Sequence, residues 1–229
     1  MKKYFYVILL ICFVIGISGC ISSEISTSSN DNNSNGTSGD IASSDFSNIN
    51  NIVYSGKGNL IIETGADADS LTINSHEDGE DDHEKGLINH KIEGNTLTIN
   101  NMDTHDHESC DVVLKIKSKN IKSVSGNGPS NITLNGISSD SFTATVDSGN
   151  LTVNGNSSTI TLTVNGNGII DAKNLVGSTG TVTVNGEGKI LTNVSGTLTA
   201  TVNGKGNVGY SGNPTLTSNA NSGGTITKI

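Results

Sequence analysis

Strict alternation of polar and apolar residues marks the second half of the chain. The segments TLTV at 161–164, TVTV at 181–184 and TATV at 199–202 each place Thr at every other position. Because successive side chains of a β-strand point to opposite faces, Val and Leu occupy one face and Thr the other. The pattern predicts β-strands that bury their apolar face.

A glycine-rich motif of five residues, VNGxG, follows these strands and sets a repeat. Strict and looser copies begin at Tyr54, Val124, Val146, Val164, Val184, Val202 and Ala220. From Val124 onward the copies are about 18 to 22 residues apart, and no helical pattern lies between them. A period of this length indicates one supersecondary unit that is repeated as a solenoid.

Aligned copies keep apolar residues of similar size at equivalent positions. The column at the motif comprises Val124, Val146, Val164, Val184, Val202 and Ala220. Two residues earlier lie Ala144, Leu162, Val182 and Ala200, and four residues earlier lie Phe142, Ile160, Gly180, Leu198 and Leu216. After the turn come Leu60, Ile132, Leu151, Ile170, Ile190 and Val208. Stacked coils require such columns, so the predicted fold class is all-β, a parallel β-helix with coils of about 18 to 22 residues.

The motif itself suggests how each coil turns. Gly and Asn tolerate positive φ, which a tight corner requires. The column formed by Asn165, Asn185 and Asn203 could stack its amides in a hydrogen-bonded ladder. Asn-Gly is also the strongest short hairpin signal, so an antiparallel meander or sandwich is the rival fold. A meander would not keep columns in register at this period, and we therefore favour the β-helix.

Composition narrows the function classes. The 229 residues include 28 Gly, no Trp and no Arg, only 3% are aromatic, and the net charge is −9. Long helices are rich in Ala, Glu, Leu and Arg, but this chain is instead rich in Gly, Asn, Thr and Ser. This composition excludes a helical bundle. An acidic chain without Arg lacks the basic surface that nucleic-acid binding requires. No nucleic-acid partner is therefore expected.

The N-terminus has the features of an export signal. Lys2 and Lys3 precede an apolar run over about 4–17, and Ser18 and Gly19 precede Cys20. This arrangement resembles the lipobox of prokaryotic lipoproteins, in which Cys20 would be lipidated and would anchor the protein to the membrane. The alternative is an uncleaved anchor, but the run is short against the ~20 residues of a spanning helix.

These features divide the chain into three parts. We expect a signal peptide at 1–19, a lipid-anchored Ser/Asn/Gly linker at 20–45 and a β-helical domain at 46–229. The linker is too poor in apolar groups to fold, and it would span about 25 to 30 Å. The expected location is extracytoplasmic, at the cell membrane or cell surface.

A cluster of potential metal ligands lies between the first strands. It comprises His76, His83, His90, His105, His107 and Cys110, with many acidic residues among them. Imidazole, carboxylate and thiolate bind zinc and other divalent cations. Two other interpretations stay open, which are weak cation association and a pair of solvated acidic loops without a metal role. Apart from this metal, no cofactor is expected.

From about Ile52 to Ile229 the chain resembles the head GIN domain family of exported auto-transporter adhesins. The likeness rests on an opening GKGNLIIETG, on IEGNTLTIN at 92–100, on IKSVSGNG at 121–128, on the VNGxG turns and on the closing stretch from Tyr210. The resemblance implies a right-handed parallel β-helix on the cell envelope with an adhesive or scaffolding role. No catalytic residues come with it.

An enzymatic function is an alternative, because parallel β-helices include polysaccharide lyases and hydrolases. Such sites need paired carboxylates for acid and base catalysis, or calcium with a basic residue that abstracts the proton. Asp147, Asp171 and Glu187 are scattered singly along the coils. The sequence therefore favours a non-enzymatic envelope module whose partner is a glycan or a cell-surface protein. Divalent-metal binding is the first alternative, and a polysaccharide lyase or hydrolase is the second.

Overall fold

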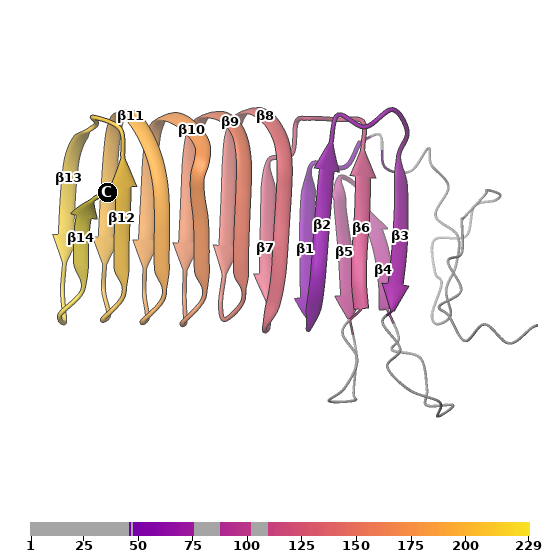
Figure 1. The fold of residues 1–229 in the computed structure, drawn as a ribbon, viewed down its shortest axis with the longest axis horizontal. Helices are drawn as coiled ribbons and strands as arrows, with labels where there is room; N and C mark the ends of the chain where they lie inside the picture. The colour runs from indigo at the N-terminus through magenta and orange to yellow at the C-terminus, as the bar shows by residue number, and fades with distance from the viewer. Residues whose placement is uncertain (1–45, 47, 76–87, 102–109) are drawn as a thin grey trace, which may run out of the picture.

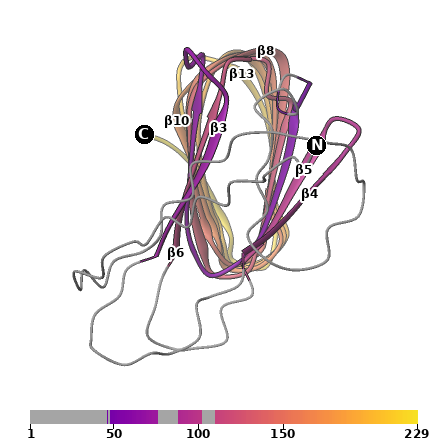
Figure 2. The same cartoon turned by 90° about the vertical axis from the view of Figure 1, so that its right-hand side faces the viewer.

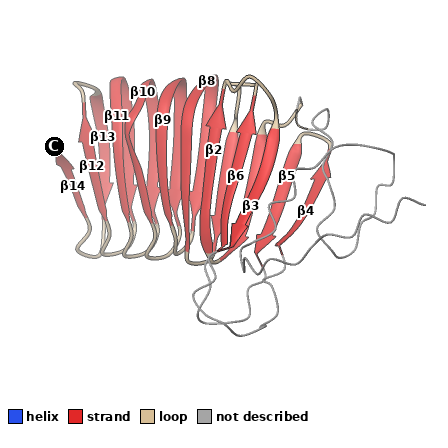
Figure 3. Ribbon diagram, turned by 45° about the vertical axis from the view of Figure 1, so that its right-hand side comes forward, coloured by secondary structure: helices blue, strands red, loops and turns tan. Residues whose placement is uncertain are grey.

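The computed structural model describes residues 46, 48–75, 88–101 and 110–229, and this part of the chain is an all-β solenoid (Figures 1 and 3). The strands are β1 (Asn51–Gly56), β2 (Gly58–Thr64), β3 (Ser70–Ser75), β4 (Ile88–Glu93), β5 (Thr96–Asn101), β6 (Cys110–Ile116), β7 (Ser123–Asn127), β8 (Ser130–Val146), β9 (Asn150–Val164), β10 (Ile169–Val184), β11 (Lys189–Val202), β12 (Asn207–Ser211), β13 (Thr215–Ala220) and β14 (Thr225–Lys228). Within these ranges there is no helix that could cross a membrane.

Each coil contributes one strand segment to each of two facing layers. The long strands β8 to β11 bend midway, so their first halves belong to layer A and their second halves to layer B. Layer A also contains β3, β6, β2, β12 and β14, and layer B also contains β4, β5, β1, β7 and β13. Viewed along the stack, the layers form a flattened ring (Figure 2).

The coils stack in parallel, and the register confirms most of the predicted columns. Val184 pairs with Val164 on one side and Val202 on the other, and all three side chains are fully buried. In layer A, Ile170 pairs with Leu151 and with its counterpart in β11. Most outward positions carry polar side chains, as the alternation predicted, and Ile169 is an exposed apolar exception. The core is therefore a column of aliphatic side chains from successive coils.

One predicted alignment is wrong by two residues. Val124 pairs with Ala144, and Gly126 rather than Val124 pairs with Val146. A Cβ on Gly126 would lie 2.9 Å from Cδ1 of Ile132, so the Ile132 side chain fills the space that a valine occupies in later coils. The predicted alignment placed Gly126 in a turn, whereas in the structure Gly126 occupies a position of the buried core column.

The glycines of the repeated turns serve a different purpose from the predicted one. None of the glycines in the three VNGxG copies has φ in the left-handed range. Instead, a Cβ on Gly186 would lie 2.3 Å from the carbonyl oxygen of Gly166, and a Cβ on Gly204 would lie 2.2 Å from that of Gly186. Only glycine lets the stacked turns approach this closely.

The predicted asparagine ladder is confirmed and is longer than expected. Nδ2 of Asn203 donates to Oδ1 of Asn185 (2.9 Å), and Nδ2 of Asn185 donates to Oδ1 of Asn165 (3.0 Å). Nδ2 of Asn165 then donates to a carboxylate oxygen of Asp147 (3.1 Å). The amides all point the same way, and a charged acceptor ends the ladder.

The first coils are less regular than the later ones. β1 lies between β5 and β7, and β2 lies between β6 and β8, so the first coil of the chain is not the first in the stack. The chain turns at Gly94 (φ 59°), so that β4 and β5 form an antiparallel pair. A second antiparallel pair joins β3 to β6.

Candidate binding surfaces

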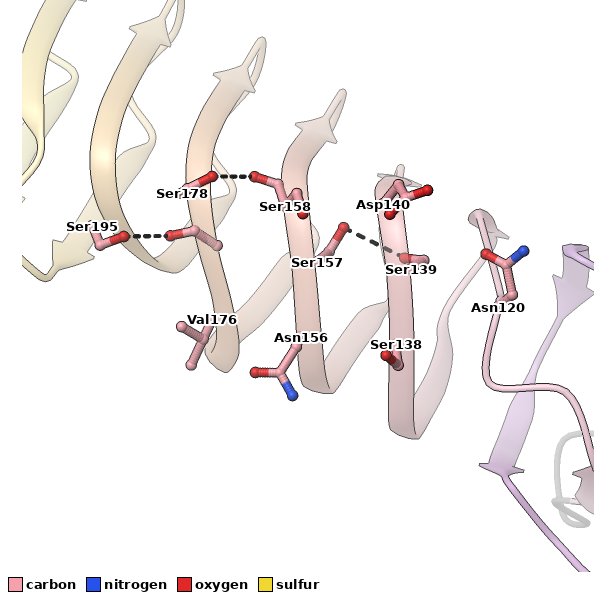
Figure 4. A pocket seen from close by; sticks show the side chains of 11 residues that line it. Asn120, Ser138, Ser139, Asp140, Asn156, Ser157, Ser158, Val176, Ser178 and Ser195 are labelled. Carbon is pink, nitrogen blue, oxygen red and sulfur yellow. Dashed lines mark hydrogen bonds between the residues drawn. The ribbon is translucent and has the colours of Figure 1, made fainter.

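An open groove of about 560 Å³ follows the bend where the long strands pass from layer A to layer B (Figure 4). We call it the bend groove. It crosses the four strands β8 to β11, and Asn120 lies at one end of it (Figure 4). Its lining residues are Asn120, Ser138, Ser139, Asp140, Asn156, Ser157, Ser158, Val176, Gly177, Ser178 and Ser195. Hydroxyl and amide groups dominate this surface.

Irregular backbone shapes the bend. The pairing of β8 with β9 shifts between Leu134 and Ile137, and the pairing of β9 with β10 shifts after Asp171. Gly136 (φ 79°) and Gly155 (φ 140°) adopt left-handed conformations at these points. Bulges re-aim side chains, so residues that would alternate in and out along a regular strand face the groove together.

The groove is built from three short rows that run across the coils. Ser138, Asn156 and Val176 are in register with one another, and their side chains lie along one margin in Figure 4. The second row comprises Ser139, Ser157 and Gly177, and the third comprises Asp140, Ser158 and Ser178. The sequence signal for this site is a set of serines that recur at about the coil period, at 138–139, 157–158, 178 and 195, and the predicted columns do not include them.

Several groove hydroxyls are held by hydrogen bonds between coils. Oγ of Ser178 donates to the carbonyl of Ser158 (2.9 Å), and Oγ of Ser195 donates to the carbonyl of Gly177 (3.2 Å). The buried Oγ of Ser157 accepts from Oγ of Ser139 in the neighbouring coil (3.4 Å) and donates to the carbonyl of Thr159 in its own strand (2.9 Å). With the donor hydrogen fixed, the oxygen lone pairs remain to accept from a ligand.

The groove is electrically almost neutral. Asp140 is the one ionisable residue among its lining residues, and it is exposed to solvent. Val176 contributes an apolar contact, with 49% of its surface exposed. Such a surface can exchange hydrogen bonds with a neutral hydroxylated ligand and offers no paired carboxylates for acid–base chemistry.

The outer surface of layer B carries a regular array of threonines, which we call the threonine face. Its first column is Ser141, Thr159, Thr179, Thr197 and Thr215. The second is Thr143, Thr161, Thr181, Thr199 and Thr217, and the third is Thr145, Thr163, Thr183, Thr201 and Asn219. These positions are exposed or half-buried, and none is charged. Within the described part of the chain, their hydroxyls make no side-chain hydrogen bond to protein.

The outer surface of layer A differs although the same strands form it. Ile169, Asp171 and Lys173 occupy the outward positions of β10, and Lys189 begins the next rung. Nζ of Lys173 lies 3.2 Å from a carboxylate oxygen of Asp171. Charged, apolar and amide side chains are therefore mixed on this side.

The predicted metal ligands fall mostly outside the described residues. This applies to His76, His83, His105 and His107, and also to the lipidation candidate Cys20. Metal binding and lipidation at these positions stay predictions.

Two predicted ligands are described. His90 lies in β4 of layer B, where it pairs with Ile99, whereas Cys110 begins β6 of layer A. Burial lowers the pKa of His90, because desolvation disfavours the imidazolium. In the described ranges, no three residues of the His, Cys, Asp and Glu types come together in a metal-binding arrangement.

The three carboxylates that were candidates for catalysis lie in different parts of the solenoid. Asp147 ends the asparagine ladder, Asp171 pairs with Lys173 in layer A, and Glu187 lies exposed in a turn. The structure does not bring them together.

The fold is shared with solved structures. A "putative adhesin" from Bacteroides fragilis aligns with a TM-score of 0.59 and 21% identity, over 79% of this chain and 92% of that chain. A "putative lipid binding protein" from Parabacteroides distasonis aligns with a TM-score of 0.50 and 16% identity, over 80% of this chain and 94% of that chain. No curated protein matches the chain in sequence. The model of the family described as "Putative auto-transporter adhesin, head GIN domain" matches residues 50–214, and the chain belongs to this family.

Proposed function

We propose that the protein is a non-enzymatic adhesive module of the cell envelope that binds neutral, hydroxyl-rich ligands, namely glycans, in the bend groove. Membership of an adhesin family indicates an exported or cell-surface protein. Lipidation of Cys20 and the linker 20–45 would hold the solenoid about 25 to 30 Å from the membrane. At this distance the groove would be accessible to extracellular partners.

The observation that carries the proposal is the chemistry of the groove. Serine hydroxyls, the amide of Asn156 and the apolar side chain of Val176 line one continuous surface. Hydroxyls both donate and accept, as sugar hydroxyls do, and several of these serines are fixed in place by bonds between coils. Pre-organised groups lose little conformational entropy on binding.

The lining also supports a non-enzymatic role. General acid–base cleavage of a glycosidic bond uses two carboxyl groups about 5 to 9.5 Å apart. Among the groove residues the structure describes, Asp140 is the single carboxylate. The groove is therefore suited to holding a glycan and lacks the pair that would cleave one.

Binding of the purified chain to a printed array of neutral oligosaccharides tests this function. We expect Val176→Lys to weaken binding about tenfold, because it would place a charged side chain at the margin of an almost neutral groove. Ile169→Lys is the matched control, since Ile169 is an exposed apolar residue of the same strand, with 40% of its surface exposed, and lies in layer A. We expect the control to bind as the unmodified chain does.

The proposal is contradicted if the unmodified chain binds no glycan on the array or if the two variants lose binding equally. A melting curve by circular dichroism establishes that both variants are folded. Hydrolysis products released from a bound oligosaccharide would contradict the non-enzymatic part.

A further inference from the structure

The threonine face is a two-dimensional lattice, and its dimensions follow from the backbone. Neighbouring rungs of a parallel sheet are about 4.8 Å apart. Outward residues two positions apart on one strand, such as Thr181 and Thr183, are separated by about 6.6 Å. The columns keep their register from β9 to β11 without a shift, so both spacings repeat across the face.

Crystalline water has a similar lattice. Each oxygen in ice is bonded tetrahedrally to four others at about 2.75 Å. Tetrahedral geometry then places second neighbours about 4.5 Å apart and gives a repeat of about 7.3 Å along the stacking direction. The rung spacing agrees with the shorter repeat to about 0.3 Å, and the spacing along the strand agrees with the longer one to about 0.7 Å.

We propose that the threonine face binds ice, with the threonine hydroxyls and methyl groups ordering water in the lattice positions of a growing crystal. This function goes beyond glycan adhesion in the bend groove and does not rest on it. The occupant is uncharged, and so is the face, since no charged residue lies in its five rungs. A charged side chain would instead orient the nearby water molecules toward itself, which disturbs the tetrahedral arrangement of ice.

Threonine suits this role better than other polar residues. Its β-branched side chain has restricted χ1 freedom, so a row of threonines loses little entropy when it is ordered against a solid. The hydroxyls also stay available, since in the described residues none of them is bonded to another protein side chain. Exposed positions such as Thr181 and Thr199 place hydroxyl and methyl side by side at the surface.

The array is not imposed by the fold. The same coils present Asp171, Lys173 and Leu191 on the outer surface of layer A, where the strands pair just as well. Stacking therefore tolerates charge and bulk at outward positions. Threonine fills all but two of the fifteen positions of the threonine face, and stacking of the coils does not require it there.

The experiment freezes a solution of the purified full chain slowly and measures the fraction of protein incorporated into the ice. We expect the unmodified chain to enter the ice and to facet growing crystals under the microscope. Thr163→Lys should reduce incorporation about tenfold, because a long cation in the middle of the face holds the sheet away from the lattice. Thr181→Lys, at a more exposed position, gives a second variant with the same expected loss.

Thr152→Lys is the matched control. Thr152 lies in the same strand as Thr163, is half-buried like it, and faces outward from layer A. We expect this variant to enter ice as the unmodified chain does. The proposal is overturned if the unmodified chain is excluded from ice like an inert protein, or if Thr152→Lys lowers incorporation as much as the two layer B variants. Glycan binding of all these variants should be unchanged, which separates this proposal from that for the bend groove.

Discussion

The two layers of the solenoid share strands, core and turns, yet their outer surfaces are unlike. In β10 the first half presents Ile169, Asp171 and Lys173, and the second half presents Thr179, Thr181 and Thr183. Both halves bury their alternate residues against the same column of aliphatic side chains. The inner pattern is therefore set by stacking, whereas the outer pattern is free to follow function.

This comparison separates two kinds of regularity. Inner columns are regular because each side chain must fit between its neighbours in the adjacent coils. The outer columns of layer A show that outward positions carry no such requirement. A regular outer column therefore indicates that the surface binds a regular partner. The threonine face, with three such columns side by side, is the largest regular array of this kind described above.

The largest expected effect comes from disturbing the shared core. Val184→Asp would place a carboxylate between the buried Val164 and Val202, where it has no partner. An unpaired buried charge should lower the free energy of unfolding by more than about 4 kcal/mol, and the coils should unfold together. Thermal denaturation followed by circular dichroism measures the loss.

The neighbouring residue supplies the contrast for this prediction. Thr183 faces outward from layer B, so Thr183→Asp should change the free energy of unfolding by no more than about 0.5 kcal/mol. Similar melting temperatures for the two variants would contradict the assignment of inner and outer faces.

A smaller effect is expected at the turns that follow layer B. A methyl group on Gly186 would lie 2.3 Å from the carbonyl oxygen of Gly166, and backbone has to move to accept it. Gly186→Ala should therefore cost about 3 kcal/mol of unfolding free energy, measured by urea denaturation.

Gly94 provides the reference for that substitution. Its φ is 59°, but no atom lies within 4 Å of the position its Cβ would take. Gly94→Ala should cost only about 1 kcal/mol, the penalty for a left-handed residue. A larger loss at Gly94 than at Gly186 would contradict the requirement for glycine at the close contact between stacked turns.

The asparagine ladder at the edge of layer B should contribute less to the free energy of unfolding than the close stacking at Gly186 does. Asn185→Ala removes one donor and one acceptor from the middle of the ladder, and we expect a loss of about 1 kcal/mol because the ladder is exposed to solvent. Asn167→Ala is the control, since Asn167 is exposed in the same kind of turn and has no side-chain hydrogen bond in the described structure. Equal stabilities for the two variants in urea would mean that the ladder adds nothing measurable.

The smallest effect concerns pH at the other end of layer B. Burial lowers the pKa of His90 in the folded protein below its ordinary value of 6.5, which the unfolded chain retains. As the pH falls below 6.5, the unfolded state therefore takes up a proton that the folded state resists, and stability decreases. His90→Gln should make stability less dependent on pH between about 7.5 and 5. Urea denaturation across this range checks the sign, and an unchanged slope would contradict the effect of burial.

The regular coils could be predicted because their inner residues repeat in size. Phe142, Ile160 and Leu198 occupy one column in the structure as they did in the alignment. Val124 was misplaced because the alignment followed the glycine of its motif, and only the packing of Ile132 shows that Gly126 belongs to the core.

Other features depend on contacts that the sequence period does not encode. The insertion of β1 between β5 and β7 joins segments far apart in the chain, and no local pattern indicates it. The bend groove arises from register shifts near Ile137, and a shift of pairing is visible only between strands. The expected cluster of metal ligands stays a prediction, since only His90 and Cys110 belong to the described residues.

The central claim is that one core supports two unlike outer surfaces, and that the regular threonine face of layer B orders water whereas the mixed surface of layer A does not. A crystal structure at a resolution that shows ordered water tests it most directly. We expect rows of water between the threonine columns of layer B, each bonded to hydroxyls of adjacent rungs and repeated at the rung spacing of about 4.8 Å. Over the outer surface of layer A we expect no such rows. Equally irregular water on both surfaces would contradict this claim.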